Sequence, residues 1–274
     1  MSYATMLVHV DADGGSDNRD RIAADLASRF NSHLIGAAAW MPKPAFAVEG
    51  VTIDPEPTDA DLNEMRAALS KRADQFRATV GAGRKEVEWR SALTFPTEFI
   101  TREARAADLI IIGADRTAYD PYRATDAGEV ILRAGRPVLV VPPNIEKLAG
   151  KRVVVAWKDV REARRAIADA LPFLHVAQEV FIVEACKTGQ ERDAQCRLKD
   201  VADYLARHQI TKVTERVLPV EGTAPNALLQ LVGETTADLI VAGAYGHSRL
   251  GEWIFGGMTQ SLLTRSPICC LFSH

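Results

Sequence analysis

The chain has 274 residues, of which 47% are hydrophobic and 25% are charged, as in an ordinary globular protein. A formal net charge of −3 argues against a nucleic-acid-binding protein, and no apolar run approaches the length of a membrane span. The N-terminus lacks the pattern of a signal peptide and the four cysteines have no metal or redox spacing, so we expect reduced thiols and a cytoplasmic location.

Strand-like and helix-like segments alternate along residues 1–146, and near-continuous apolar runs such as Leu109–Gly113 are typical of parallel strands buried on both faces. The predicted strands are Thr5–Val10, Leu34–Ala39, Glu86–Ser91, Leu109–Gly113 and Val138–Val141. The predicted helices are Asp20–Phe30, Leu62–Val80, Glu98–Ala106 and a last helix that contains Val130–Leu132. The proline-rich stretch Met41–Asp59 is expected to form a long loop.

The same alternation returns in residues 150–274. The predicted strands are Arg152–Ala156, Glu179–Glu184, Lys212–Leu218, Asp238–Ala242 and Ile268–Phe272. The predicted helices are Glu162–Leu171, Glu191–Arg207, Pro225–Glu234 and Met258–Leu263. Strands that alternate with helices indicate βαβ units and a parallel sheet, in which ligands bind beyond the carboxyl ends of the strands.

The two halves are copies of each other. Ala107–Ala114 (ADLIIIGA) is closely similar to Ala237–Ala244 (ADLIVAGA), 130 residues further on, and Pro137–Val140 is matched by Pro267–Cys270 at the same spacing. Two matches at one spacing argue for a duplication. We therefore predict two tandem flavodoxin-like domains, 1–146 and 150–274, each with a five-stranded parallel sheet flanked by helices.

The stretch Gly243–Thr259 follows a predicted strand and leads into a predicted helix, and we call it the glycine loop. Gly243 and Gly246 lack a Cβ and allow the backbone to approach a ligand closely. Gly256 and Gly257 lie where the helix begins, and free N–H groups and the helix dipole favour an anion there. The pattern predicts a phosphate-binding loop, although its spacing is neither that of a P-loop nor GxGxxG. The alternative is a connection whose glycines only turn the chain.

The spacing Gly243-x2-Gly246-x9-Gly256-Gly257-x-Thr259 resembles the nucleotide motif of the universal stress protein family, Gly-x2-Gly-x9-Gly followed by Ser or Thr. Gly257 takes the place of that Ser or Thr, and Thr259 matches a further hydroxyl often found two residues on. The resemblance covers the whole chain as two copies. It implies the adenine nucleotide alpha hydrolase-like variant of the fold, an ATP ligand with or without Mg²⁺, and a role in the stress response.

The same resemblance implies roles for individual residues. Backbone N–H groups of four residues would face the phosphates: Gly246, Gly256, Gly257 and Met258. The Thr259 hydroxyl would donate to a phosphate, and Gly243 would lie under the ribose or the first phosphate. His247 and Arg249 would either pair with phosphate or be solvated loop residues. Ala156–Lys158 would border the adenine and the ribose, and Ala185, just past its strand, would offer backbone to the adenine edge.

One departure concerns the adenine end of this site. Lys158 stands where nucleotide-binding members usually have an aspartate. Lys158 would then reach a phosphate as a point charge, and Asp159 would take over the carboxylate's role. Trp157 would either stack on the base or fill the base pocket and exclude it.

The first half lacks the glycines of the loop. At the positions 130 residues before the loop residues, only Gly243 has a glycine counterpart, Gly113. The counterparts of Gly246, Gly256, Gly257 and Thr259 are Arg116, Asp126, Ala127 and Glu129. Two carboxylates would repel a phosphate. We therefore predict that the first half does not bind ATP in the usual way.

Three functions remain open: a nucleotide-binding regulator, a slow ATPase, and an interaction module without nucleotide. No catalytic base or metal-ligand spacing is evident, so at most weak ATP hydrolysis is expected. His9 is expected to be a packed strand residue, and Cys269 and Cys270 to be strand core facing opposite sides. Family members often pair through the last strand of each domain, so Val138–Val141 and Ile268–Phe272 are expected to form an intrachain pseudo-dimer, with homodimerisation left open.

Overall fold

The computed structural model describes residues 2–15, 17–43, 47–48, 51–52, 57–81, 87–114, 120–220, 223–246 and 257–274. Of the candidate residues, His247, Arg249 and Gly256 lie outside these ranges, as does Arg116 of the first half.

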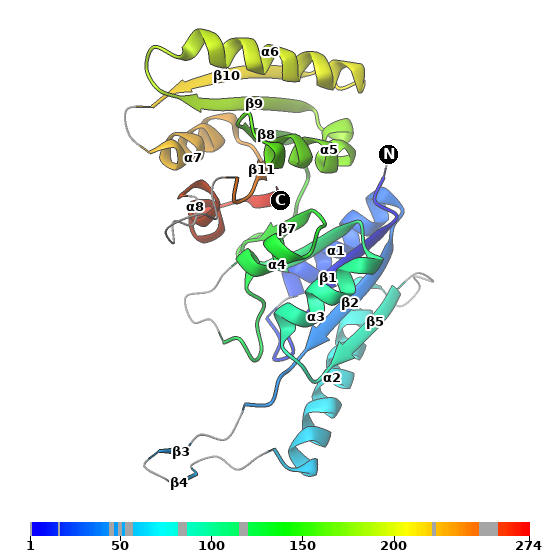
Figure 1. Cartoon of the computed structure of the whole chain (residues 1–274). Helices are drawn as coiled ribbons and strands as arrows, with labels where there is room; N and C mark the ends of the chain where they lie inside the picture. Colours follow the sequence, from blue (N-terminus) through cyan, green and yellow to red (C-terminus); the bar gives the residue numbers. More distant parts are fainter. Residues whose placement is uncertain are drawn as a thin grey trace.

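The first half contains seven strands and four α-helices within the described residues (Figure 1). Its strands are β1 (Thr5–His9), β2 (His33–Ala39), β3 (Ala47–Val48), β4 (Val51–Thr52), β5 (Val87–Ala92), β6 (Leu109–Gly113) and β7 (Val138–Val141). Its helices are α1 (Asp17–Phe30), α2 (Asp59–Val80), α3 (Pro96–Glu103), the 3₁₀ turn η1 (Ala104–Ala106) and α4 (Ala127–Arg133).

The predicted long loop Met41–Asp59 differs from the structure in two respects. The short strands β3 and β4 pair within it, and α2 already begins at Asp59. Thr58 and Asp61 form a capping box: the Thr58 side chain accepts a hydrogen bond from the Asp61 N–H, and the Asp61 side chain accepts one from the Thr58 N–H. This reciprocal cap explains why α2 starts three residues before the apolar periodicity does.

The second half repeats the arrangement without an equivalent of β3 and β4 among the described residues. Its strands are β8 (Arg152–Trp157), β9 (Glu179–Cys186), β10 (Val213–Pro219), β11 (Leu239–Gly243) and β12 (Cys269–Ser273). Its helices are α5 (Arg161–Val176), α6 (Glu191–Arg207), α7 (Ala224–Thr235) and α8 (Gly257–Arg265). Strand β9 continues through Ala185, which we expected to lie just beyond the strand.

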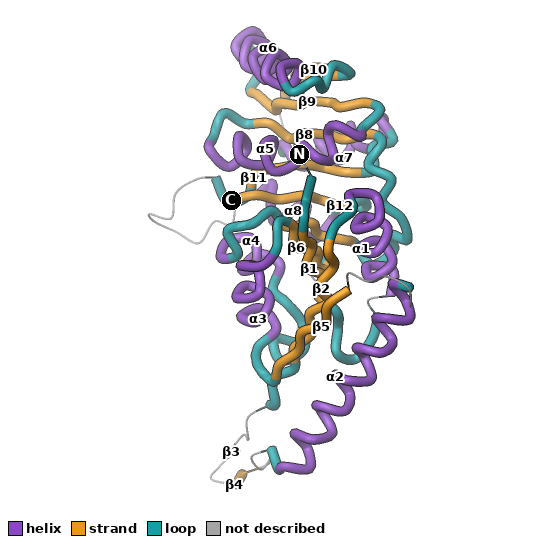
Figure 2. Tube along the Cα trace, turned by 90° about the vertical axis from the view of Figure 1, so that its right-hand side faces the viewer, coloured by secondary structure: helices purple, strands orange, loops and turns teal. Residues whose placement is uncertain are grey.

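Ten strands form one continuous sheet in the order β10-β9-β8-β11-β12-β7-β6-β1-β2-β5 (Figures 1 and 2). Within each half the strands are parallel and follow the order 3-2-1-4-5. The predicted α/β fold with two parallel five-stranded units is therefore confirmed. The order is that of the doubly wound dinucleotide-binding folds, whereas flavodoxin itself has 2-1-3-4-5.

The last strands of the two halves, β7 and β12, join the two units. They pair antiparallel, with Cys270 opposite Val140 and Phe272 opposite Val138. The expected intrachain pairing of the two last strands is thus present. It removes two sheet edges that would otherwise be open to another chain.

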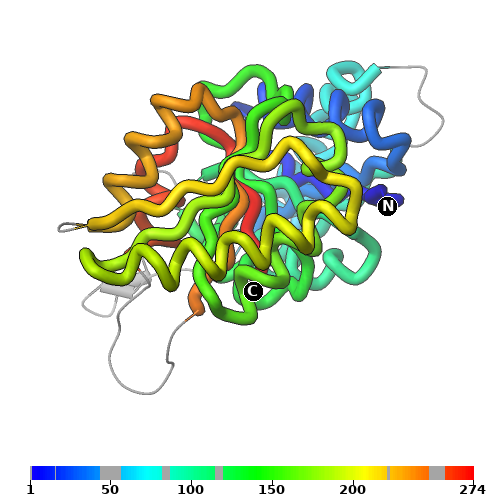
Figure 3. The backbone as a smooth tube through the Cα atoms, turned by 90° about the horizontal axis from the view of Figure 1, so that it is seen from above, coloured from blue at the N-terminus to red at the C-terminus, as the bar shows by residue number. Residues whose placement is uncertain are grey.

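Helices cover both faces of this sheet, and the strands run between them when the molecule is seen from above (Figure 3). Helices α1, α2, α5 and α6 contribute to one hydrophobic core, and α3, α4, α7 and α8 to the other. Cys269 lies in the first core and Cys270 in the second, which confirms that they face opposite sides. Burial raises the pKa of the Cys270 thiol to about 12, so it stays protonated and unreactive at neutral pH.

An aromatic cluster joins the two halves beside α1 and α5. The rings of Tyr3, Phe30 and Phe173 lie with their centroids 5.2–5.8 Å apart. The Tyr3 hydroxyl donates to the backbone carbonyl of Asp169, at 2.6 Å. Since Tyr3 and Phe30 belong to the first half and Phe173 and Asp169 to the second, the cluster fixes one half against the other.

The segment between β7 and β8 is also held in place. Leu148 is buried, and Arg29 of α1 donates to the backbone carbonyls of Leu148 and Ala149, both at 2.6 Å. The proposed domain boundary falls in this segment, which packs against both halves.

Candidate functional site

Among the described candidate residues, Ala156–Lys158 and Gly243 lie at the carboxyl ends of β8 and β11. These strands are neighbours, with Ala242 opposite Ala156, so Trp157 and Gly243 end adjacent strands. The glycine loop leaves β11 at this edge. In doubly wound sheets this edge is where ligands bind.

Helix α8 begins at Gly257, as predicted from the glycine pair. Gly257 is exposed, and a Cβ added there would have no described atom within 4 Å. The first N–H groups of a helix have no partner within it and favour an anion. The start of α8 therefore offers open space at the positive end of a helix.

Thr259 lies in the first turn of α8. Its side chain is buried, with 3% of the residue exposed, and its hydroxyl oxygen accepts a hydrogen bond from the Tyr245 N–H at 3.4 Å. The hydroxyl hydrogen is still available as a donor. Thr259 thus ties the start of the glycine loop to the start of α8.

The structure gives Gly243 a packing reason to be glycine, besides the predicted ligand contact. A Cβ there would lie 2.6 Å from the backbone N of Ala163 and 2.6 Å from the carbonyl carbon of Glu162. The first turn of α5 approaches closely because the helix crosses directly over the end of β11. The ribose or phosphate contact assigned to Gly243 remains a prediction.

Sequence reasoning missed Glu162, a buried carboxylate beside the glycine loop. It is 4% exposed, and its Oε1 accepts a hydrogen bond from Arg161 Nε at 2.5 Å. The other oxygen, Oε2, lies 3.0 Å from the point that a Cβ of Gly246 would occupy. Burial alone would raise the pKa of Glu162, but the hydrogen bond and charge of Arg161 outweigh it and hold the pKa below its ordinary value. An ionised carboxylate oxygen therefore faces the loop.

The helix that follows β8 was the signal that could have located Glu162. Helix α5 starts at the same sheet edge as the glycine loop, so a carboxylate in its first turn is within reach of that loop. Its burial could not be read from the sequence, because Glu162 has the ordinary appearance of an acidic residue in a first helical turn.

The adenine end of the predicted site is more crowded. The Trp157 ring packs against the core on the α5 and α6 side, and its indole nitrogen finds no acceptor within the described part of the chain. Lys158 is exposed. The Asp159 carboxylate forms an ion pair with Arg164 at 2.5 Å, so its charge is already partnered. Both roles considered for Trp157, stacking on the base and filling the base pocket, remain predictions.

In the first half, the start of α4 is closed by a side chain. Asp126 is the N-cap of α4, and its carboxylate accepts a hydrogen bond from the Glu129 N–H at 2.8 Å. Ala127, which replaces Gly257, is fully buried. The chain's own carboxylate thus takes the position that an anion would need.

Arg19 fills the space above the end of β6. Its Nη1 lies 2.3 Å from the point that a Cβ of Gly113 would occupy. Its Nη2 forms an ion pair with Asp11 at 3.0 Å, and Asp11 lies 3.5 Å from Nδ1 of His9. All three side chains are buried, and His9 is 1% exposed, as expected for a packed strand residue. The strand ends that correspond to the candidate site are occupied by this ionic cluster.

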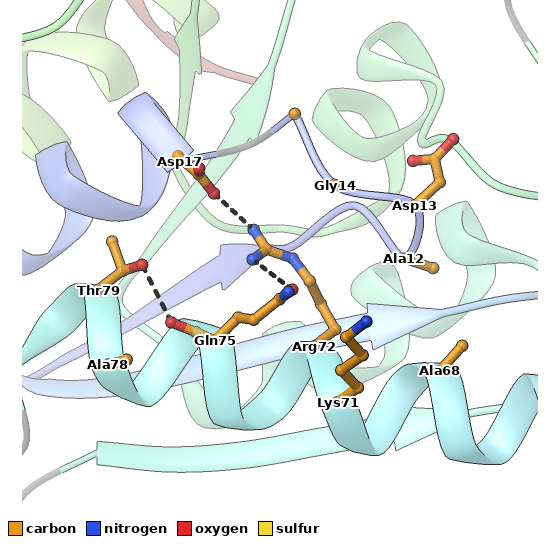
Figure 4. Close-up of a pocket in the computed structure, with 11 residues that line it drawn as sticks. Ala12, Asp13, Gly14, Asp17, Ala68, Lys71, Arg72, Gln75, Ala78 and Thr79 are labelled. Atoms are coloured by element: carbon orange, nitrogen blue, oxygen red, sulfur yellow. Dashed lines mark hydrogen bonds and ion pairs between the residues drawn. The ribbon is translucent and has the colours of Figure 1, made fainter.

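A pocket of about 610 Å³ does occur in the first half, between the Ala12–Gly15 turn, Asp17 at the start of α1, and α2 (Figure 4). The buried Arg72 forms ion pairs with Asp17 and Asp20 and donates to the Asp11 carbonyl. Lys71 and Asp13 add one charge of each sign to the lining. The charge of Arg72 is thus balanced within the protein, and we assign no ligand to this pocket.

Comparison with known proteins agrees with this reading of the second half. Residues 150–273 match the universal stress protein family. The second half is thus similar to universal stress protein domains over nearly its whole length. A universal stress protein from Synechocystis is 23% identical over 220 residues, which cover 79% of this chain and 75% of that protein.

Solved structures extend the similarity to the whole fold. The crystal structure of a universal stress protein from Archaeoglobus fulgidus has a TM-score of 0.75 and 16% identity, with 98% of each chain covered. A protein of unknown function from Pseudomonas aeruginosa has a TM-score of 0.62 and 16% identity, covering 98% of this chain and 92% of that one. At these identities the similarity concerns the fold, and both halves take part in it.

No group of three or more potential metal ligands is found among the residues that the structure describes. None of the helices in the described ranges is long and apolar enough to cross a membrane.

Proposed function

We propose that the second half of this chain binds ATP at the glycine loop and acts as a nucleotide-dependent regulator in the stress response. The observation that carries this proposal is the open start of α8 at Gly257, at the carboxyl end of β11. The equivalent helix start in the first half is closed by Asp126. Thr259 supports the proposal with a hydroxyl in the first turn of α8.

The proposal includes a divalent cation such as Mg²⁺. Glu162 Oε2 faces the loop, and an ionised carboxylate there would repel phosphate. Mg²⁺ is usually held in proteins by one or two carboxylates together with substrate phosphates. Glu162 is the described carboxylate placed to take that part, and the cation would supply charge neutralisation when bound.

The test is a calorimetric titration of the full-length protein with ATP, with and without Mg²⁺, on the wild type and on Gly257→Val. The added side chain enters open space, so it leaves the described packing intact and obstructs only a ligand. We expect at least a hundredfold loss of ATP affinity. Gly233→Val is the matched control, because Gly233 is also a helical glycine with open space around it, in α7. Equal affinity of wild type and Gly257→Val would contradict the proposed site.

An interaction module without nucleotide is the second candidate. It is supported if the Trp157 ring, which packs against the core, also fills the base pocket, because a filled base pocket would exclude adenine. Absence of any ATP binding by the wild type, together with no nucleotide released on denaturing the purified protein, would favour this candidate.

Weak ATP hydrolysis is a third proposal, and phosphate release with and without Mg²⁺ would measure it. Light scattering would test whether the whole chain dimerises, and fractionation would test the proposed cytoplasmic location.

A further inference from the structure

Tyr245 has an unusual backbone conformation in the glycine loop. Its φ is +57°, in the left-handed region that residues with a side chain seldom adopt. The residue lies two positions beyond the end of β11 and is half-buried. A non-glycine residue held in this region is fixed by its surroundings, so the contacts of its side chain are informative.

The side chain of Tyr245 reaches the first half of the chain. A Cβ added to Gly128 of α4 would lie 2.6 Å from the Tyr245 hydroxyl oxygen, 3.2 Å from the Asp126 Oδ1 and 3.7 Å from the ring carbon that bears the hydroxyl. Gly128 is buried and lies in a regular helix, so it provides space and not an unusual backbone angle. Helices α4 and α8 also contact each other, across the junction of the two halves (Figure 1).

The backbone of Tyr245 is joined to the helix that begins the proposed phosphate site. Its N–H donates to Thr259 Oγ1 in the first turn of α8, at 3.4 Å. Tyr245 therefore contacts α4 of the first half with its ring and α8 of the second half with its backbone. The start of α4 is in turn fixed by its Asp126 cap.

We propose that Tyr245 is a positioning residue through which the first half sets the position of Gly243–Gly246 and of the first turn of α8, and hence the nucleotide affinity of the second half. The half that has lost its own anion site then serves as the support of the remaining one. This inference rests on the proposed function, because its effect is measured as a change in ATP affinity. It names a contact between halves that the glycine motif itself does not contain.

The test is a double-mutant cycle between Gly128 and Tyr245 in the full-length protein. Gly128→Ala places a methyl group against the Tyr245 hydroxyl and should lower ATP affinity at least tenfold, although Gly128 lies in the half without a site. Tyr245→Phe removes the colliding oxygen and leaves the nearest ring atom at ordinary contact distance. The double variant Gly128→Ala with Tyr245→Phe should therefore recover affinity to within about threefold of Tyr245→Phe alone.

Val130→Ala is the control for a merely structural effect, since Val130 is a fully buried residue of the same helix. It should lower the thermal midpoint while ATP affinity per folded molecule stays unchanged. Unchanged affinity in Gly128→Ala, or no recovery in the double variant, would overturn the proposal.

Hydrogen exchange separates this proposal from the proposed function. Gly128→Ala should speed amide exchange in peptides from α8, residues 257–265, and the added Tyr245→Phe should slow it again, whether or not ATP binds. If no variant binds ATP but exchange follows this pattern, the nucleotide proposal fails and the contact between halves stands. If exchange in these peptides does not respond to Gly128→Ala, the contact does not position the first turn of α8.

Discussion

The two halves of this protein share a strand order and differ at the same helix terminus. Helix α4 begins with Asp126, whose carboxylate caps its own N–H groups, whereas α8 begins with Gly257 in open space. Both are the last helices of their units and both start at the carboxyl edge of the sheet. The comparison teaches that this scaffold keeps its core and its pairing strands while a few residues at one helix start decide whether an anion has room.

The glycines that end β6 and β11 extend the comparison. Gly113 and Gly243 are equivalent in the sequence repeat, but Gly113 faces the guanidinium of Arg19 and Gly243 faces the backbone of α5. A flexible side chain can withdraw, and a helix backbone cannot. The same glycine at the same place therefore carries different constraints in the two halves.

The largest expected effect comes from breaking the contact between the halves. Phe173→Ala removes a fully buried ring from the cluster with Tyr3 and Phe30, and it should lower the free energy of unfolding by about 3–5 kcal/mol. Urea titration followed by tryptophan fluorescence and by circular dichroism would measure it. A loss below about 1 kcal/mol would show that the halves are stable without this cluster.

The paired glycines give the next largest effect. Gly243→Ala should cost about 1–3 kcal/mol, because its methyl group meets the backbone of α5. Gly113→Ala should cost less, because Arg19 can move away at the expense of its ion pair with Asp11. Urea midpoints of the two variants test this order. The reverse order would mean that the Arg19 side chain yields less to an added methyl group than the backbone of α5 does.

Removing the cap of α4 tests whether the first half is closed by Asp126 alone. Asp126→Ala should cost about 1 kcal/mol of stability, as for other N-caps. It should not create a second ATP site, because Ala127 is buried and Arg19 still fills the space at Gly113. The measurement is the number of ATP molecules bound per chain, by calorimetry. Two per chain in Asp126→Ala would show that Ala127 and Arg19 do not keep the first half closed.

Glu162→Gln has the smallest expected effect on stability, under about 1 kcal/mol, because its partner Arg161 is mostly exposed and screened. The folded-state pKa of Glu162 lies below the ordinary 4.5, so the ionised carboxylate stabilises the fold above that pH. The stability difference from wild type should therefore disappear as the pH falls through the lowered pKa.

The same variant should bind ATP several-fold more tightly in the absence of Mg²⁺, because a negative charge facing the loop has been removed. Glu103→Gln is a matched control, a buried glutamate paired with Arg90 in the first half. A gain of ATP affinity in both variants, or in neither, would contradict the claim that the Glu162 carboxylate lies beside the bound phosphates.

The sequence by itself determined the duplication and the order of strands and helices, whereas the pairing of the two last strands was expected only from the resemblance to the universal stress protein family. The duplication and the element order follow from local apolar periodicity and from repeated segments such as Ala107–Ala114 and Ala237–Ala244. The glycine pair at the start of α8 was also readable, because glycine before a helix has a local meaning. Loss of the loop glycines in the first half was equally visible from the repeat.

Only the tertiary structure decided what surrounds those positions. Glu162 beside Gly246, Arg19 above Gly113 and Tyr245 on Gly128 are contacts between elements far apart or differently oriented in the chain. No local pattern encodes them, since burial and partner depend on how helices cross the ends of strands. The sequence thus locates the candidate loop, and the fold decides which charges and which half of the molecule it meets.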